Sequence, residues 1–422
     1  MNRKHKNYVI AGTFALGSFS VFYFMPMLFS VGYTGSADEK KVAQAEVATS
    51  SAKIAGVASS TKSALSTIVV THIKTPDPLK AVYMSACYAS APSLRAKLVK
   101  MIDTTELNAI VIDVKDYTGT IAYDTTDPKL AETKGTGCRV KDMQAFVASL
   151  HEKGIYTIAR VTVFQDPYYT KAHPELAVKR ASDGGTWKDR KGLAFIDVSA
   201  KPYWEYISAL ALDAHALGFD EINFDYIRFP SDGNMKDIAF TWTKNTPKAV
   251  ALENFYSYLN QAVKPSGVVI SADLFGMTTT NTDDLNIGQV LERAMPYFDY
   301  IAPMVYPSHY PSNFNGWKNP NTVPYALIKF VMSRGAVRAE AKTTTVAHFG
   351  GERVGTTTPA VYTKEAYNRN KLRPWLQDFD YGGVYGTAEV RAQIQATYDS
   401  GLSSWVLWDP SNRYTPSALK AS

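Results

Sequence analysis

The chain has 422 residues, of which 45% are hydrophobic and 12% aromatic, so it can bury a large core and is not a disordered protein. Its formal net charge of +6, from 45 basic and 39 acidic residues, is too small and too dispersed to indicate a nucleic-acid partner. Cys87 and Cys138 are its only cysteines, which excludes a cysteine-based metal site. In an exported protein they could form one disulfide or remain two small apolar side chains.

The N-terminal region indicates export. Three of the first six residues are Lys or Arg, and residues 8–33 form an apolar stretch without charge. This stretch is long enough to cross a hydrocarbon core of roughly 30 Å, and basic residues before it keep the N-terminus in the cytoplasm. We therefore expect residues 1–35 to be a transmembrane signal anchor with a cytoplasmic basic end, so that the membrane is a partner. Cleavage near Gly35 or Ala37, which would secrete the protein, is the alternative.

The rest of the chain divides by composition. Residues 36–78 are rich in Ala, Ser, Thr, Val and Lys and contain no aromatic residue, which predicts a flexible stalk. In residues 79–412, short β-branched or aromatic runs alternate with amphipathic segments, which is typical of repeated βα units. Residues 413–422 form a C-terminal tail, and we assign no fold to an insertion at residues 336–370.

Eight runs in residues 79–412 read as strands, which is the number that closes a (β/α)₈ TIM barrel. The predicted strands are residues 81–88, 109–116, 156–164, 221–229, 268–276, 300–307, 373–379 and 403–409. The clearest predicted helices are residues 141–153, 203–217, 247–263, 287–295 and 388–400.

Strand periodicity places polar residues inside the barrel, because alternate side chains of a strand face opposite ways. Four predicted strands turn apolar residues toward the helices and Asp113, Lys115, Arg160, Asp225 and Asp273 inward. Barrel interiors are normally filled with apolar side chains, so several inward charges indicate an active site at the carboxyl ends of the strands. The alternative is an ion network that only plugs the barrel.

Asp225 and Asp273 are the predicted catalytic pair, because they end neighbouring strands. Glycoside hydrolysis needs an ionised carboxylate and a protonated carboxylic acid. We expect Asp225 to be the nucleophile, kept ionised by Arg228 and Lys115, and Asp273 to be the general acid/base in a more apolar setting. No cofactor and no metal are expected, since no predicted strand end pairs His with Glu.

Further polar and aromatic residues at the strand ends are candidate binders of a polysaccharide or oligosaccharide. Aromatic rings cover the apolar faces of sugars, and charged or amide groups bond their hydroxyls. The residues are Asp113, Lys115, Asp116, Arg160, Arg228, Tyr306, Gln377, Asp378 and Trp408. Gln377 and Asp378 could instead cap the following helix.

Several long motifs resemble a family of bacterial glycoside hydrolase domains that was formerly of unknown function. They are VIDVKD at residues 111–116, ARVTVFQDP at 159–167, NFDYIRFP at 223–230, YIAPMVYPSHY at 300–310 and RPWLQDF at 373–379. The resemblance covers residues 81–412 and implies a distant kinship to α-amylase-type barrels, in which an Asp closing the fourth strand is the nucleophile and a Glu closing the fifth is the acid. Asp225 matches the first position, whereas Asp273 replaces the Glu and Asn223 replaces an Arg, so α-glucan specificity does not follow.

Together these features predict a glycosidase that cleaves an extracytoplasmic or cell-envelope polysaccharide. A tethered barrel that binds polysaccharide without cleaving it is the main alternative. A metal- or phosphate-dependent enzyme, in which Gly382, Gly383 and Gly386 after the seventh strand hold phosphate, has less support, because no strand end pairs His with Glu and export removes the protein from cytosolic phosphosugars.

Overall fold

The computed structural model describes residues 69–135, 137–345 and 361–422. The predicted signal anchor and residues 36–68 of the predicted stalk lie outside these ranges. Within them, no helix has both the length and the apolar character needed to span a membrane.

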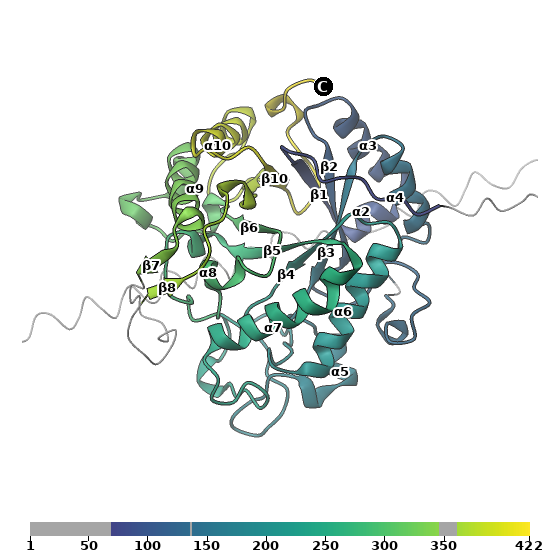
Figure 1. Ribbon diagram of the computed structural model, residues 1–422, viewed down its shortest axis with the longest axis vertical. Helices are drawn as coiled ribbons and strands as arrows, with labels where there is room; N and C mark the ends of the chain where they lie inside the picture. Colours follow the sequence, from purple (N-terminus) through teal and green to yellow (C-terminus); the bar gives the residue numbers. More distant parts are fainter. Residues whose placement is uncertain (1–68, 136, 346–360) are drawn as a thin grey trace, which may run out of the picture.

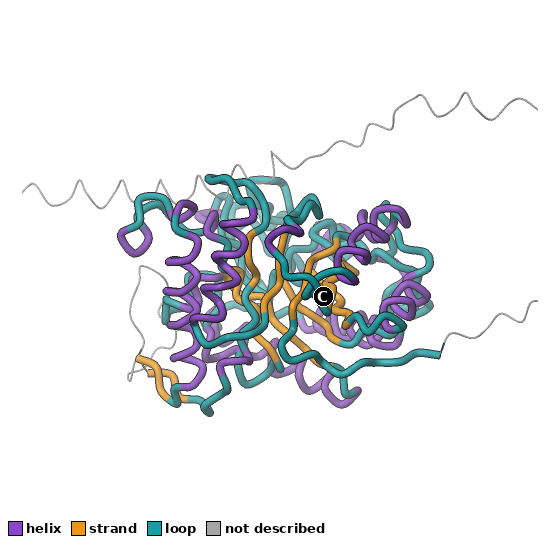
Figure 2. The backbone as a smooth tube through the Cα atoms, turned by 90° about the horizontal axis from the view of Figure 1, so that it is seen from above, coloured by secondary structure: helices purple, strands orange, loops and turns teal. Residues whose placement is uncertain are grey.

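Eight parallel strands form a closed barrel in the order β1-β10-β9-β6-β5-β4-β3-β2, surrounded by helices (Figures 1 and 2). The predicted (β/α)₈ barrel is therefore confirmed. Its strands are β1 Lys80–Met84, β2 Ala109–Lys115, β3 Tyr156–Thr162, β4 Glu221–Asp225, β5 Val269–Phe275, β6 Tyr300–Met304, β9 Trp375–Gln377 and β10 Trp405–Trp408.

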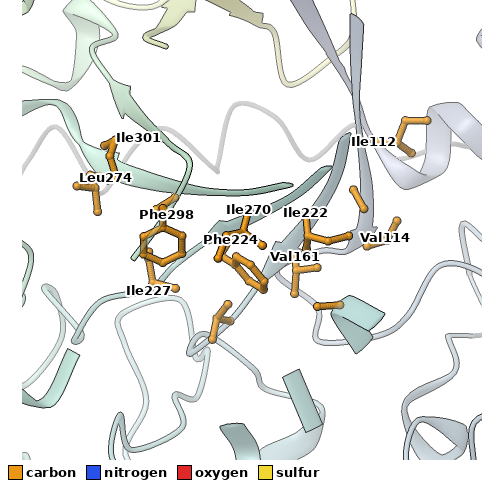
Figure 3. Packing of buried hydrophobic residues seen from close by; sticks show 14 of the residues in the cluster. Ile112, Val114, Val161, Ile222, Phe224, Ile227, Ile270, Leu274, Phe298 and Ile301 are labelled. Atoms are coloured by element: carbon orange, nitrogen blue, oxygen red, sulfur yellow. The ribbon is translucent and has the colours of Figure 1, made fainter. Parts of the chain in front are cut away.

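Helices follow the strands in the chain and cover the outside of the barrel. The helices are α2 Ala86–Ser90, α3 Pro92–Asp103, α4 Met143–His151, α5 Tyr169–Ala172, α6 Lys201–Ala216, α7 Lys248–Val263, α8 Leu291–Ala294, α9 Pro324–Glu340 and α10 Thr387–Asp399. The apolar strand residues predicted to face them, such as Ile112, Ile222 and Ile270, belong to one buried cluster with side chains of the helices (Figure 3). Burial of these apolar faces holds helices and strands together.

Two parts of the chain differ from the expected elements. The segment at residues 336–370 has structure at both ends, because α9 extends to Glu340 and β7 Thr343–Thr345 pairs antiparallel with β8 Val361–Thr363. The helix expected at residues 287–295 is only the single turn α8. Both regions lie on the outside of the barrel, where loop length is less constrained than in the sheet.

Both ends of the described chain are attached to the barrel. Ile73 N donates to Asp220 Oδ1 at 2.7 Å, and Thr75 Oγ1 lies 3.0 Å from the hydroxyl of Tyr156. Contacts with the barrel thus begin before the predicted end of the stalk at residue 78. At the other end, the backbone N–H of Lys420 donates to Glu106 Oε1 at 3.0 Å, so the predicted tail also packs on the domain.

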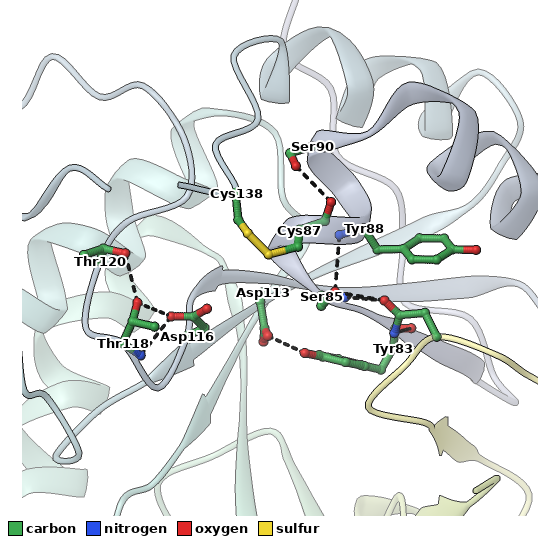
Figure 4. Close-up of a disulfide and its surroundings, with 11 residues drawn as sticks. Tyr83, Ser85, Cys87, Tyr88, Ser90, Asp113, Asp116, Thr118, Thr120 and Cys138 are labelled. Carbon is green, nitrogen blue, oxygen red and sulfur yellow. Dashed lines mark hydrogen bonds between the residues drawn. A yellow bond between two sulfur atoms is a disulfide. The ribbon is translucent and has the colours of Figure 1, made fainter. Parts of the chain in front are cut away.

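A disulfide joins Cys87 to Cys138, which resolves the choice that the sequence left open (Figure 4). Cys87 lies in α2, directly after β1, whereas Cys138 lies in the long loop between β2 and α4. The bond therefore fixes that loop to the α2 segment beside the carboxyl end of β1.

Candidate active site

Arg160 binds carboxylates from three different strands. Its Nη1 donates to Asp113 Oδ1 at 2.6 Å, its Nη2 forms an ion pair with Asp225 Oδ2, and its Nε lies 3.6 Å from Asp273 Oδ2. The three aspartates and Arg160 are called the carboxylate cluster below. The predicted convergence of Asp225 and Asp273 is thus present, since both contact one guanidinium.

Strand register explains this convergence. Asp113 pairs with Arg160, Arg160 with Asn223, and Asn223 with Ser271, so these residues form one inward-facing layer across β2 to β5. Asp225 and Asp273 lie two residues farther along β4 and β5, and two residues restore the same facing side. The site is therefore near the carboxyl ends of the strands, where TIM-barrel enzymes have their active sites.

Asp273 is held from two sides. Its Oδ1 accepts hydrogen bonds from Asn223 Nδ2 at 2.9 Å and from the indole N–H of Trp375 at 2.7 Å. Burial, reinforced by the charge of Asp225, raises the pKa of Asp273 to about 8. At neutral pH this carboxyl group is therefore mostly protonated, as a general acid must be.

Asp225 ends β4, and the chain turns sharply after it. The next residue, Tyr226, has a φ of 52°, a left-handed conformation that is uncommon for a residue other than glycine. This turn brings the Tyr226 N–H within 2.5 Å of Asp225 Oδ1. Asp225 thus accepts a backbone hydrogen bond on one oxygen and pairs with Arg160 on the other.

Asp113 completes the cluster together with Tyr83, which was not among the residues predicted for the site. The hydroxyl of Tyr83 donates to Asp113 Oδ2 at 2.5 Å (Figure 4). Burial raises the pKa of Asp113 to about 6, although Arg160 and Tyr83 oppose this shift. The strand periodicity that selected Asp113 also places Tyr83 inward on β1, so the same signal could have found it. Trp375 was missed because its short strand shows little periodicity.

The carboxylate cluster is almost closed to solvent. Asp225 is 3% exposed and Asp273 is 1% exposed, whereas the Arg160 side chain retains 15% exposure. Arg160 is therefore the most accessible side chain of the cluster.

The expected contribution of Lys115 to this site is wrong. The pairing of β2 with β3 shifts after Asp113, so that Lys115 pairs with the outward-facing Val161. One extra residue reverses which face a side chain takes. Lys115 is fully buried outside the barrel lumen, where its Nζ lies 2.9 Å from Asp166 Oδ2 and 3.2 Å from the Tyr203 hydroxyl.

Arg228 also does not pair with Asp225, contrary to the expectation. Its Nη1 donates to the carbonyl of Phe229 at 3.0 Å, and no carboxylate lies within 4.0 Å of its guanidinium in the described part of the chain. The strand ends at Asp225 and Tyr226 is left-handed, so Arg228 lies in the loop that follows. Arg160 is the cation that Asp225 contacts.

Three candidate sugar binders are occupied by contacts within the protein. Asp116 accepts the N–H of Thr118 at 2.9 Å in a turn, and Gln377 bonds Ser308 N and the Phe379 carbonyl. Asp378 accepts the N–H and hydroxyl of Thr415, at 2.9 and 2.7 Å. Their role in binding sugar is not tested by these contacts, but each also holds a loop.

Tyr306 and Trp408 lie together beside the cluster. Their ring centroids are 5.0 Å apart, and Trp408 also contacts the ring of Tyr83 at 6.4 Å. Trp408 is partly exposed, whereas Tyr306 is buried. Trp408 therefore offers an aromatic surface next to the carboxylates, which is the arrangement expected for a sugar-binding site. In the described ranges, no group of three or more His, Cys, Asp or Glu side chains is arranged to hold a metal ion.

Comparison with known families gives one match. The family described as "Putative glycosyl hydrolase domain" matches residues 81–414. A search of curated proteins finds no match.

Two solved structures are similar to this chain. The PgaB (BpsB) glycoside hydrolase domain from Bordetella bronchiseptica is 12% identical, with 79% of this chain and 94% of that domain covered and a TM-score of 0.54. A hypothetical protein from Ruminiclostridium thermocellum is 31% identical over 46% of this chain and 96% of its own, with a TM-score of 0.42. At such low identity, the likeness to the Bordetella domain shows a shared fold alone.

Proposed function

Starting from the fact that the chain belongs to the glycosyl hydrolase domain family, and is thus a glycosidase by family, we propose that it cleaves an extracytoplasmic polysaccharide through Asp225 and Asp273. The observation that carries this proposal is that both carboxyl groups contact one guanidinium at the carboxyl ends of neighbouring strands. Two carboxyl groups in such proximity are what glycoside hydrolysis requires.

In this mechanism the two acids have different roles because their surroundings differ. Asp273 donates its proton to the oxygen of the scissile bond, which leaves with the departing sugar. Asp225 attacks the anomeric carbon, and water then releases the sugar from it while Asp273, now ionised, accepts the proton of that water. The elevated pKa of Asp273 supports the acid role, and the ion pair with Arg160 supports the anionic role of Asp225.

Substitution of each acid tests the assignment. Asp225→Asn and Asp273→Asn should each lower kcat by at least about 100-fold, the contribution typical of such groups, and thermal unfolding checks that each variant is folded. Retained turnover in both variants would remove the assignment. A product with inverted anomeric configuration, measured by NMR, would make Asp225 a base that activates water instead of a nucleophile.

A barrel that binds polysaccharide without cleaving it is a second candidate, favoured by the near-complete burial of Asp225 and Asp273. The double variant Asp225→Asn/Asp273→Asn separates the two. If the protein only binds, wild type and double variant have equal affinity and neither releases reducing ends from any glycan.

We also propose that the barrel lies outside the cytoplasm and is tethered by residues 1–35. The basic residues before the apolar stretch support this orientation. The Cys87–Cys138 disulfide supports an oxidising compartment. Protease treatment of intact cells should digest the barrel, and removal of residues 1–35 should leave the protein in the cytoplasm.

A further inference from the structure

Arg228 is a nearly buried cation enclosed by aromatic rings. It is 8% exposed, and its Cζ lies 5.1 Å from the ring centroids of Tyr226 and Phe275 and 5.8 Å from that of Phe195. Rings in this arrangement stabilise a guanidinium by cation–π attraction. They offset part of the cost of removing the charge from water but supply no negative charge.

Among the described residues, no acidic side chain forms an ion pair with Arg228 within 4.0 Å. Its Nη1 donates to the Phe229 carbonyl at 3.0 Å and to Ser231 Oγ at 3.3 Å, and both acceptors are neutral. Over the described ranges, its Nε and Nη2 donate no hydrogen bond. In comparison, the buried Arg160, Arg338 and Arg373 each pair with a carboxylate. A nearly buried charge is normally paired, and neither Nε nor Nη2 of Arg228 is among the fully buried atoms that lack a partner, so both lie where an anion from outside the chain can reach them.

The position of Arg228 connects it with the carboxylate cluster. Tyr226 follows Asp225 directly, and Phe275 lies two residues after Asp273, so two of the three rings around Arg228 come from the ends of the strands that carry the proposed catalytic acids. The guanidinium is therefore next to the place where the reacting sugar would lie.

A second cation lies near Arg228. The charges of Lys191 and Arg228 act on each other, and Lys191 also acts on His309. Burial, followed by the charge of Lys191, lowers the pKa of His309 to about 4, so its imidazole is neutral at pH 7. Arg228 and Lys191 are called the cationic rim. Asp189 and Asp232 lie close enough to act on Lys191 and offset part of its charge.

From this arrangement we propose that Arg228 binds the carboxylate of an acidic sugar, and that the substrate is a polysaccharide containing uronic acid or another carboxylate-bearing residue. The proposal rests on the proposed function, because it assigns a substrate class to the same site. A planar guanidinium binds a carboxylate through two parallel hydrogen bonds, which Nε and Nη2 can donate. Such a contact would hold the acidic group away from the negatively charged Asp225.

Binding to chemically matched glycans tests the proposal. The probes are polygalacturonate, alginate and hyaluronate, each compared with a form whose carboxyl groups have been reduced to hydroxymethyl groups. The Asp225→Asn variant is used so that bound glycan is not consumed. We expect at least one acidic glycan to bind about tenfold or more tightly than its reduced form, the factor expected for loss of a charged hydrogen bond. Equal affinity for every pair would overturn the proposal.

Substitution of Arg228 then assigns the preference to this residue. In the same background, Arg228→Met should abolish the preference for the acidic form, whereas Arg228→Lys should keep part of it, because a point charge remains without the planar geometry. Thermal unfolding checks that each variant is folded. If Arg228→Met does not fold, Lys191→Met serves as the second variant and should reduce the preference by a smaller factor. An unchanged preference in the folded variants would overturn the proposal.

The experiments distinguish failure of the acidic-sugar proposal from failure of the proposed hydrolase function. Cleavage of neutral glycans by the wild type, with no preference for acidic ones, would keep the hydrolase and refute the role of Arg228. Arg228-dependent binding of an acidic glycan that is never cleaved would support the role of Arg228 and refute hydrolysis.

Discussion

The indole N–H of Trp375 donates a hydrogen bond of 2.7 Å to Asp273 Oδ1, although the two residues are 102 positions apart in the chain. Trp375 begins β9, which is separated from β5 by β6 in the barrel. Asp273 on β5 is thus oriented by a residue of β9, which lies on the far side of β6. Closure of the barrel is what brings this donor to the carboxyl group.

Trp375→Phe removes this hydrogen bond and keeps most of the ring packing. Because the bond favours the ionised form of Asp273, its loss should raise the pKa of Asp273 further and move the basic limb of the pH–rate profile to higher pH. We expect kcat to fall about tenfold, since the acid is also less well oriented. Trp405→Phe is the matched control, because Trp405 Nε1 donates to the Tyr398 hydroxyl at 3.0 Å. An unshifted profile in Trp375→Phe would contradict this role.

The pH dependence of activity should show the acid directly. With a pKa of about 8, Asp273 loses its proton as the pH rises through that value, and kcat should fall above pH 8. A rate that stays constant to pH 10 would exclude Asp273 as the general acid.

The pH dependence of stability has a sign that follows from the same pKa. The pKa of Asp273 is raised in the folded state from its usual 3.8 to about 8, so the folded protein binds the proton more tightly than the unfolded chain does. The stability gained from this tighter proton binding is complete below about pH 4 and is lost as the pH rises through about 8. Asp273→Asn resembles the protonated acid at every pH. The Tm of this variant should therefore match that of wild type at pH 4 and exceed it at pH 8.5. A difference in Tm that stays the same at both pH values would contradict the raised pKa of Asp273.

Lys115 provides a test of the corrected assignment. Lys115→Met leaves Asp166 buried without its cation, which should lower the free energy of unfolding by about 3–5 kcal/mol. Chemical denaturation measures this loss. The double variant Lys115→Met/Asp166→Leu should recover part of it. Where the single variant is still folded, kcat should stay within about threefold of wild type, because Lys115 does not contact the carboxylate cluster. A roughly 100-fold lower kcat would show that Lys115 contributes to the active site after all.

The disulfide should stabilise the loop after β2. Cys87 and Cys138 are 51 positions apart, and closing a loop of that length corresponds to about 4 kcal/mol in the chain-entropy description. The variant Cys87→Ser/Cys138→Ser should have a lower Tm than wild type, and a reducing agent should lower the Tm of wild type only. Equal Tm values for wild type and variant without reductant would show that the bond does not contribute.

Local pattern in the sequence was enough to predict much of the fold. Apolar residues alternate along β2 to β5 because one face of each strand packs against helices, and the same alternation placed Asp113, Asp225 and Asp273 inside the barrel. Eight such strands predict closure, since the number of strands limits the architectures available. The proposed catalytic pair could be predicted in this way because both acids follow the regular two-residue period.

Only the tertiary structure decided which charges meet. A single shift in register between β2 and β3 turned Lys115 outward, and Arg228 lies in the loop that follows the left-handed Tyr226. Arg160 became the cation shared by the three aspartates, Tyr83 a donor to Asp113 and Trp375 a donor to Asp273, because barrel closure brings together strands that are distant in the chain. The sequence determines which face of a regular strand is polar. Which side chains form pairs depends on register, turns and closure, and these are set by packing of the whole domain.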